Sequence, residues 1–375
     1  MADTRADEPN DPGFIAMAPL EPAEDVPDAV LAEQLLSFGV ILFPELQHWR
    51  DDSQKRYVVS AARGHNILAQ LPTGHGKSVL AIVPALARGG LTLFVAPTLS
   101  LVDDLYAKCV SRQILAFRLT GQSQYDEQAL CGEAVVHYQG GVVLTTPEKA
   151  CSGQMQLLLE KVHVTRVVID EAHCWVADRE WRSGYMRLAG WLGPFIKKKM
   201  VSLTFMSATL PGDFLSRASE ELDVPREPWT VLISSVSRPC LRLEVESKVR
   251  VTGAAKRIAE LLQATPEAQC AVVFCRLPSQ CDNVCESLRK LGSVAARAGT
   301  RLCNVYYSAL PMETRRRRLR KWLSREVRCL IGTTSIAMGI DHPSIGLVVH
   351  YGLPDSATSY AQHVGRAARR AGQTA

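Results

Sequence analysis

The stretch LAQLPTGHGKS, which spans residues 68–78, decides the architecture of this chain. An apolar run that predicts a β-strand, Asn66–Gln70, leads into it, and a predicted helix, Val79–Ala87, follows it. Gly74 and Gly76 allow the backbone between these two elements to curl, so that its N–H groups face a single point. Together with the positive end of the helix dipole, those N–H groups form a site for a phosphate group.

Two side chains at the end of this stretch complete the predicted phosphate loop. Lys77 can reach the β- and γ-phosphates of a nucleotide, and the Ser78 hydroxyl can bind Mg²⁺. The strict pattern begins with a glycine where this chain has Leu71, so the match is imperfect. The core Thr-Gly-x-Gly-Lys-Ser in a strand–loop–helix context still predicts a nucleotide-binding loop.

Short apolar runs alternate with helical stretches along most of the chain, and a proline-containing break at about residues 212–245 separates two series. The runs are Asn66–Gln70, Leu91–Ala96, Val142–Thr146, Arg166–Asp170 and Ser202–Met206 before the break, and Ala271–Cys275, Asn304–Tyr307, Arg328–Gly332 and Gly346–Tyr351 after it. Nearly continuous apolar runs are typical of strands that are buried on both faces of a parallel sheet. The sequence therefore predicts an α/β fold with two parallel-sheet domains.

A carboxylate pair follows another of these predicted strands. The run Arg166–Asp170 is mostly apolar up to its last residue, and Glu171 comes next. Because ligands of open α/β sheets bind beyond the carboxyl ends of the strands, we expect both acids beside the phosphate loop. Asp170 can bind Mg²⁺, directly or through water, while Glu171 orients and deprotonates an attacking water. The two elements together predict nucleotide hydrolysis.

Ordered motifs across residues 36–375 resemble those of superfamily 2 helicases, and specifically the RecQ-like family. In chain order they are LPTGHGKS at 71–78 (motif I), VAPTLSLVDD at 95–104 (motif Ia), TTPE at 145–148 (motif Ib), DEAHC at 170–174 (motif II), SAT at 207–209 (motif III), SRPCLR at 237–242, a segment from Thr333 that ends in MGID at 338–341 (motif V), and QHVGRAAR at 362–369 (motif VI). The cysteine after DEAH and the SRPCLR stretch are the RecQ-like features.

The resemblance implies two RecA-like domains, the core of a P-loop NTPase helicase that binds ATP and Mg²⁺. We expect a disordered acidic tail at residues 1–30, an ATP-binding RecA-like domain at 31–225, a linker at 226–245 and a second RecA-like domain, the C-terminal helicase domain, at 246–375. The RecQ-like family normally continues after motif VI with another strand and a cysteine-rich zinc subdomain. The second domain is therefore expected to be incomplete, truncated after motif VI.

The resemblance also assigns roles to individual residues. ATP is expected to contact residues 72–78 (Pro72, Thr73, Gly74, His75, Gly76, Lys77 and Ser78), and Mg²⁺ to contact Ser78 and Asp170. Motif VI supplies Gln362, Arg366 and Arg369, and the two arginines are expected to stabilise transition-state charge on the γ-phosphate. RecQ-like helicases recognise adenine with a glutamine upstream of motif I, because an amide can pair with N6 and N7 together. Gln54 lies 18 residues before Pro72, the spacing that the family implies, and is preferred here over Gln47.

Two further features have competing interpretations. The family carries an aromatic-rich loop after motif II, and the corresponding stretch here contains Trp175, Trp181, Arg182 and Tyr185. Its aromatic rings either stack on nucleic-acid bases or belong to the core. The basic run at residues 315–321 either follows a phosphate backbone or forms a solvated helical face.

Composition limits the classes of protein that fit. Residues 1–30 hold eight acidic residues and one basic residue, a net charge of −7, which leaves +12 on the other 345 residues of a chain with a net charge of +5. A basic body suits a polyanionic partner, and no apolar run is long enough to predict a membrane span. Several of the 11 cysteines, among them Cys270, Cys275 and Cys329, lie inside apolar runs and are expected to be buried thiols in a reducing compartment. Cys281 and Cys285 are one helical turn apart, but two thiols make a poor zinc site, so no zinc is expected.

The function that the resemblance implies is an ATP-dependent DNA helicase that moves 3′ to 5′ on single-stranded DNA and unwinds duplexes. Its expected partner is single-stranded DNA or DNA with a single-stranded tail; protein partners are not identified. Two alternatives stay open, because the SAT form of motif III is also common in RNA helicases and the chain stops soon after Arg369. These are an RNA helicase and a nucleic-acid-binding protein with weak or no unwinding activity. The expected location is intracellular, and nuclear if the source is eukaryotic.

Overall fold

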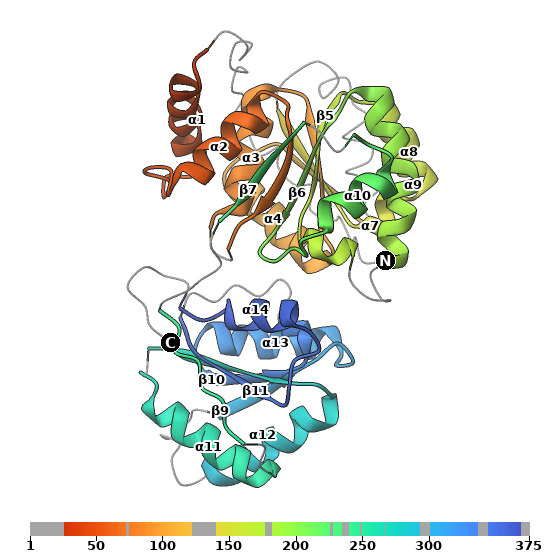
Figure 1. The fold of residues 1–375 in the computed structure, drawn as a ribbon. Coiled ribbons are helices and arrows are strands. Elements are labelled where there is room, and N and C mark those ends of the chain that lie inside the picture. The colour runs from red at the N-terminus through yellow and green to blue at the C-terminus, as the bar shows by residue number, and fades with distance from the viewer. Residues whose placement is uncertain are drawn as a thin grey trace, which may run out of the picture. The chain divides into compact units, whose positions relative to one another are not determined.

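The computed structural model describes residues 26–72, 75–121, 140–176, 182–225, 228–234, 240–247, 250–266, 268–292, 301–336 and 344–368. The chain divides into two compact units, and the division falls between residues 235 and 236. Each unit is an α/β fold built on one parallel sheet, so the predicted fold class is confirmed (Figure 1).

The first unit contains a sheet of seven described strands in the order β3-β4-β2-β5-β6-β1-β7, and every pairing is parallel. Its strands are β1 (Asn66–Gln70), β2 (Leu91–Val95), β3 (Ala116–Leu119), β4 (Gly141–Thr145), β5 (Val164–Ile169), β6 (Ser202–Ser207) and β7 (Trp229–Ile233). Its helices are α1 (Asp28–Leu42), α2 (Asp52–Ala62), α3 (Lys77–Arg88), α4 (Leu99–Ser111), α7 (Pro147–Ala150), α8 (Gly153–Lys161), the 3-10 helix η1 (Ala172–Trp175), α9 (Arg182–Lys199) and α10 (Phe214–Leu222).

Two apolar cores cover the two faces of this sheet, because successive side chains of a strand point to opposite faces. Ile67 and Ala69 of β1 join the core formed with α1, α2, α3 and α4, whereas Leu68 between them joins the core formed with α8, α9 and α10. Figure 1 shows α1, α2 and α3 on one side of the sheet and α8, α9 and α10 on the other. Burial on both faces explains the nearly continuous apolar runs in the sequence.

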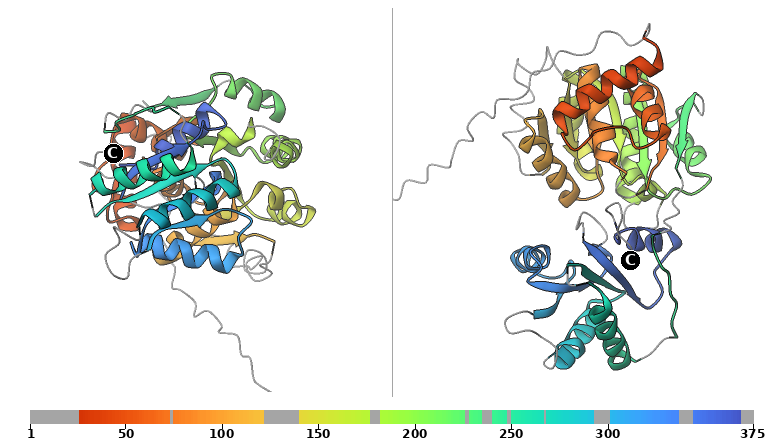
Figure 2. Two further views of the ribbon diagram at one scale, coloured as in Figure 1. Left: turned by 90° about the horizontal axis from the view of Figure 1, so that it is seen from below. Right: turned by 90° about the vertical axis from the view of Figure 1, so that its left-hand side faces the viewer.

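The second unit contains four described strands in the order β11-β8-β10-β9, again all parallel. The elements are α11 (Val251–Ala264), β8 (Cys270–Cys275), α12 (Pro278–Gly292), β9 (Arg301–Tyr306), α13 (Met312–Leu323), β10 (Val327–Gly332), the 3-10 helix η2 (Thr334–Ile336), β11 (Ile345–Tyr351) and α14 (Ala357–Val364). Helices α11 and α12 pack on one face with Val273 and Ile331, and Trp322 of α13 packs on the other with Val272 and Leu330. Both views in Figure 2 show the helices of this unit on two sides of its sheet.

The first unit extends further than the predicted boundary at residue 225. Strand β7 lies inside the expected linker 226–245, yet it pairs with β1 from Asn66 opposite Trp229 to Gln70 opposite Ile233. The prolines at 225 and 228, which were interpreted as a break in the pattern, come just before this strand. Since β7 is an edge strand with a partner on one side only, prolines next to it interrupt little hydrogen bonding.

The N-terminal boundary also differs from the prediction. Helix α1 begins at Asp28, inside the expected tail of residues 1–30, and buries Leu31, Leu35, Phe38 and Leu42 in the core of the first unit. Residues 1–25 lie outside the described part of the chain. Among the described helices, none has both the length and the apolar character needed to cross a membrane.

Candidate functional site

The phosphate loop connects β1 to α3 at the carboxyl edge of the first sheet. Leu71, the residue that replaces the expected glycine, is fully buried, and its N–H donates to the Ser207 carbonyl at the end of β6 (2.9 Å). Gly76 caps α3 with a φ of 73°, a left-handed conformation that favours glycine. Lys77 and Ser78 are therefore the first two residues of a helix whose N-terminal N–H groups are available to an anion. Thr73 and Gly74, also predicted in the loop, lie outside the described residues.

The predicted carboxylate pair follows β5 at the same edge of the sheet. The N–H of Asp170 donates to the Val95 carbonyl at the end of β2 (2.9 Å), which places Asp170 one residue beyond the strand. Burial, and then the charge of Glu171, raises the pKa of Asp170 to about 6, while Lys77 acts in the opposite direction. The Leu71 N–H bonds to the Ser207 carbonyl and His173 lies 2.9 Å from the Ser207 hydroxyl, so the phosphate loop and the motif that contains the carboxylate pair meet at the end of β6.

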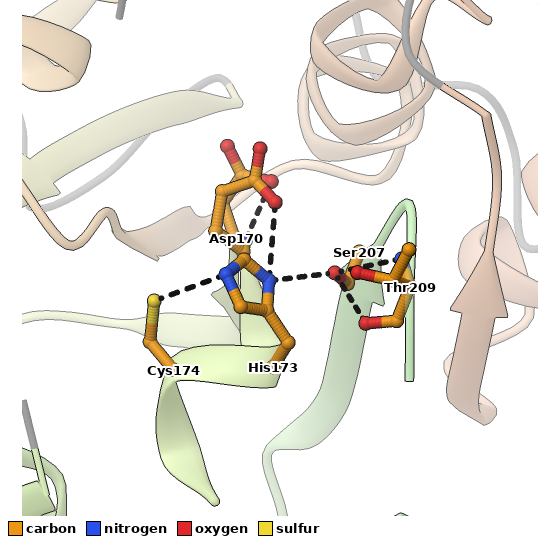
Figure 3. Close-up of polar contacts among 6 residues, drawn as sticks. Asp170, His173, Cys174, Ser207 and Thr209 are labelled. Carbon is orange, nitrogen blue, oxygen red and sulfur yellow. Dashed lines mark hydrogen bonds and ion pairs between the residues drawn. The ribbon is translucent and has the colours of Figure 1, made fainter. Parts of the chain in front are cut away.

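A histidine joins the carboxylate pair to the segment after β6. His173 Nδ1 lies 2.9 Å from Ser207 Oγ and 3.4 Å from Glu171 Oε2, and its Nε2 lies 3.4 Å from Cys174 Sγ. Figure 3 shows the imidazole between the thiol of Cys174 and the hydroxyl of Ser207.

One proton arrangement satisfies the contacts of His173 with Ser207 and Cys174. The Ser207 hydroxyl donates to the Thr209 carbonyl (3.0 Å) and accepts from the Thr209 N–H (3.3 Å), so it receives the proton of His173 Nδ1 on its second lone pair. Burial, followed by Glu171 and Asp170, raises the pKa of the Cys174 thiol, which keeps an S–H that can donate to Nε2. Motif III is thereby tied to motif II by a side chain that touches Glu171.

Gln54 lies beside the phosphate loop and Gln47 does not. The Gln54 amide is 5% exposed, donates from Nε2 to the His75 carbonyl (2.7 Å) and accepts at Oε1 from the Arg50 N–H (2.7 Å). The exposed Gln47 instead donates to the Pro44 carbonyl (2.6 Å). The position of Gln54 favours it as the residue that binds adenine, and that role stays a prediction.

Asp51 is a residue of this site that the sequence interpretation missed. It caps α2, with Oδ1 accepting from the Gln54 N–H (3.0 Å), while its Oδ2 lies 3.0 Å from His75 Nε2. The signal for it was present as Asp-x-x-Gln, because an acid followed three residues later by glutamine is a helix-capping pattern.

Motif VI lies in the second unit, on and just after α14. Gln362 and His363 are in the helix, Arg366 follows it, and Arg369 lies outside the described residues. His363 stacks on Phe274 of β8 with ring centroids 3.8 Å apart, and its Nδ1 lies 3.0 Å from Nε2 of His350 on β11. Burial, then His350 and Arg366, lowers the pKa of His363 to about 3, and burial lowers that of His350. The two histidines therefore hold α14 on the sheet as neutral rings at neutral pH.

The aromatic residues after motif II divide between the core and the part of the chain that is not described. Trp175 and Tyr185 are 1% and 0% exposed, with ring centroids 5.5 Å apart, and Trp175 also packs against Phe205 at 5.4 Å. Trp175 Nε1 donates to Glu221 Oε2 (2.6 Å). Base stacking by Trp175 is therefore wrong, because its ring is inside the apolar core. Trp181 lies outside the described residues, and Arg182 is the first residue of α9.

Cys281 and Cys285 face the core of the second unit. Both are buried, and Cys285 Sγ lies 3.2 Å from Cys303 Sγ on β9. Across the described ranges, no group of three or more His, Cys, Asp or Glu side chains is arranged to hold a metal ion. The expectation that the chain needs no zinc stays a prediction.

The basic run forms much of helix α13 in the second unit. Arg318 donates to the Val305 carbonyl (3.1 Å), and Arg320 lies 3.8 Å from Glu313, whereas Arg316 and Arg317 are exposed. These contacts leave both interpretations of the run open.

Comparison with known proteins adds the family. A family model described as DEAD/DEAH box helicase matches residues 51–218, and one described as helicase conserved C-terminal domain matches residues 253–371. Motifs I to III lie in the first match and motifs V and VI in the second.

Curated proteins similar to this chain are RecQ-like DNA helicases. ATP-dependent DNA helicase Q-like 2 of Arabidopsis thaliana is 29% identical over 329 residues, which cover 84% of this chain and 44% of that protein. ATP-dependent DNA helicase RecQ of Haemophilus influenzae is 26% identical, with coverage of 84% and 48%. ATP-dependent DNA helicase Q1 of Pongo abelii is 29% identical, with coverage of 82% and 46%. The chain thus spans less than half the length of these relatives.

Solved helicase structures share the fold at low sequence identity. Mss116p bound to single-stranded RNA and AMP-PNP has a TM-score of 0.73 at 16% identity, with coverage of 96% of this chain and 76% of that one. Mycobacterium smegmatis helicase Lhr bound to single-stranded DNA and AMP-PNP has a TM-score of 0.69 at 20% identity, with coverage of 90% and 46%. These similarities show the architecture of the core.

The role of Gln54 is tested by comparison with Gln47. Gln54→Ala is expected to reduce the preference for ATP over GTP, CTP and UTP, because it removes the amide that pairs with adenine. Gln47→Ala is the matched control and should keep that preference. Nucleotide dissociation constants measured by calorimetry check both variants, and a change confined to Gln47→Ala would show that the assignment is wrong.

Trp175→Ala should destabilise the first unit by about 3–5 kcal/mol, because it leaves a cavity among buried aromatic rings. Chemical denaturation followed by circular dichroism measures the loss, and Trp175→Phe should lose less. A folded Trp175→Ala variant with unchanged stability and weakened DNA binding would support base stacking instead.

Acid should destabilise the second unit through His363. Its pKa is near 3 in the folded chain and about 6.5 in an unfolded one, so below pH 6.5 the unfolded chain binds the extra proton. The stabilisation is present above pH 6.5 and is lost as the pH falls toward 3. Melting temperatures of the intact chain at pH 5 and pH 7 measure this loss. His363→Gln should show a smaller difference between the two pH values, and an equal difference would argue against the assignment.

Proposed function

This chain belongs to the DEAD/DEAH box helicases and is RecQ-like among them, and on that premise we propose that it is an ATP-dependent DNA motor. It would couple ATP hydrolysis to 3′–5′ movement on single-stranded DNA and to duplex unwinding. The observation that carries the proposal is the placement of Lys77 and of the Asp170–Glu171 pair at one edge of the first sheet. DNA as the substrate is supported by the similar curated proteins, which are ATP-dependent DNA helicases.

The described residues fit ATP with Mg²⁺. A glycine cap, a 12-residue helix and a lysine at its first position suit a polyphosphate. Asp170 and Ser78 offer the oxygen donors that Mg²⁺ prefers, and a magnesium ion is often held by one or two carboxylates together with substrate phosphates. Bound there, Mg²⁺ would neutralise phosphate charge and help to orient the γ-phosphate.

Each side chain then has a defined part in hydrolysis. Lys77 balances negative charge that develops on the β- and γ-phosphates. Glu171 holds the attacking water and accepts its proton. His173 contacts Glu171 and Ser207, so a shift of the segment after β6 would change the position of the base. The proposed role of Arg366 and Arg369 in stabilising the transition state rests on the family resemblance alone. The assignment of Gln362 as a further catalytic residue rests on it too.

The proposed surroundings follow from charge and thiol chemistry. A body of 345 residues with a charge of +12 favours a nucleic-acid partner. We further propose an intracellular location, nuclear if the source is eukaryotic, where the buried thiols stay reduced.

ATP hydrolysis by the purified chain, alone and with single-stranded DNA or RNA, tests this function. DNA should stimulate turnover more than RNA. Lys77→Ala should lower turnover by roughly 10²-fold or more, because it removes a charge that stabilises the transition state. Lys161→Ala, on the exposed end of α8, is the matched control and should keep full turnover.

The outcomes separate the alternatives. Stronger stimulation by RNA would favour an RNA helicase, and turnover without strand separation in a tailed-duplex assay would favour a translocase. Absence of hydrolysis under every condition, with DNA binding retained, would favour the nucleic-acid-binding protein.

A further inference from the structure

Three residues of the first unit close a polar triangle between the start of α2 and the phosphate loop. Asp51 Oδ1 accepts from the Gln54 N–H (3.0 Å), Gln54 Nε2 donates to the His75 carbonyl (2.7 Å), and His75 Nε2 lies 3.0 Å from Asp51 Oδ2. We call Asp51, Gln54 and His75 the polar triangle. It holds the phosphate loop to α2 by a main-chain contact and a side-chain contact of the same residue, His75.

Two of these three side chains are buried, which makes their polar contacts costly to lose. His75 is 7% exposed and Gln54 is 5% exposed, so neither side chain can readily exchange its partner for water. The carboxylate of Asp51 is 40% exposed, but both of its oxygens are occupied, one by the helix cap and one by the histidine. Removing the Asp51 side chain would therefore leave the buried His75 imidazole without its charged partner, and removing the His75 side chain would leave one oxygen of Asp51 without its partner.

The triangle also fixes which way the Gln54 amide points. A side-chain amide has two N–H donors and two carbonyl lone pairs. The His75 carbonyl uses one donor and the Arg50 N–H uses one lone pair, which leaves one donor and one lone pair. Adenine needs that pair of groups, since N7 accepts and the N6 amino group donates. The contacts that orient the amide are the same ones that tie it to the phosphate loop.

Gly76 brings the two ends of the nucleotide site close together. A Cβ added at Gly76, the cap of α3, would lie 3.7 Å from Gln54 Nε2. Gln54 is therefore next to the backbone that cradles phosphate, and a movement of the loop at His75 would move or release the amide. His75 therefore connects the proposed adenine-binding residue to the phosphate loop.

We propose that His75 is a positioning residue which, through Asp51, couples recognition of adenine by Gln54 to the grip of the phosphate loop. The proposal rests on the proposed function, because it takes the nucleotide to be ATP. With the triangle closed, the correct base strengthens binding of the phosphates. With His75 unable to reach Asp51, the phosphate loop loses its side-chain contact with the start of α2, and the Gln54 amide, which bonds to the His75 carbonyl, is held less firmly in the orientation that adenine requires.

The test compares ATP, GTP and inorganic tripolyphosphate, which has no base, as ligands of the intact chain with Mg²⁺. Selectivity is the ratio of the ATP and GTP dissociation constants, measured by calorimetry. His75→Leu keeps much of the volume but cannot pair with Asp51, and should lower selectivity by roughly 10-fold, the order expected when a buried polar contact with a charged group is lost. Its affinity for tripolyphosphate should change less than its affinity for ATP.

Three further variants keep the test decisive. His75→Gln retains an N–H donor and should recover most of the selectivity. Asp51→Ser keeps a helix cap but has no second oxygen for His75, so it should lose selectivity as His75→Leu does. Combining His75→Leu with Gln54→Ala should lose no more selectivity than Gln54→Ala alone, since coupled residues are not additive.

Wild-type selectivity in both His75→Leu and Asp51→Ser would overturn the proposal, as would additive losses in the double variant. Unchanged selectivity in Gln54→Ala would overturn it too, while retained ATP binding would leave the motor function standing. If the unsubstituted chain bound neither ATP nor tripolyphosphate, the proposed function itself would be wrong.

Discussion

Main-chain hydrogen bonds at the carboxyl edge of the first sheet are the constraint on which the site depends. The N–H of Leu71 is held by the Ser207 carbonyl, that of Asp170 by the Val95 carbonyl, and that of Ala96 by the Thr145 carbonyl. Each bond extends a parallel ladder one residue past its strand. Since a slip of one residue turns every side chain to the other face, the register of buried strands also sets where the functional side chains point.

The adjacent carboxylates at this edge of the sheet destabilise the folded protein but suit a site that binds a cation. Two carboxylates next to each other in a partly buried position raise the free energy of the charged site, as the pKa of about 6 at Asp170 indicates. Lys77 offsets part of that cost within the protein. A bound cation would balance the charge of the carboxylates, and a bound polyphosphate would balance the charge of Lys77. Binding of these ligands should therefore stabilise the folded protein.

Much of this arrangement could be predicted from the sequence, because local chemistry decides it. Glycine spacing and a following lysine predicted the phosphate loop, and apolar runs predicted nine of the strands to within three residues at either end. Strands β3 and β7 escaped prediction. Both lie at edges of the first sheet: β3 has only four residues, and β7 is mostly partly buried or exposed, so its apolar pattern is weak.

Side-chain contacts between distant segments were less predictable. The place of Trp175 after motif II left base stacking and core packing both open, and only the packing of β6 and α9 around it shows that it is in the core. The contact of His75 with Asp51 joins residues 24 positions apart and has no sequence pattern of its own. The ring of His363 needed β8 and β11 beside it before its low pKa was evident.

The backbone of Glu171 exposes a conflict between folding and chemistry. Its φ of 46° and ψ of 47° place it in the left-handed region, where a residue with a side chain costs about 1–2 kcal/mol and glycine costs little. Selection for stability alone would favour glycine at this turn, whereas the proposed hydrolysis requires a carboxylate there. Such a position is expected to resist stabilising substitution for as long as catalysis is under selection, and to be among the first to drift toward glycine in a descendant that only binds nucleic acid.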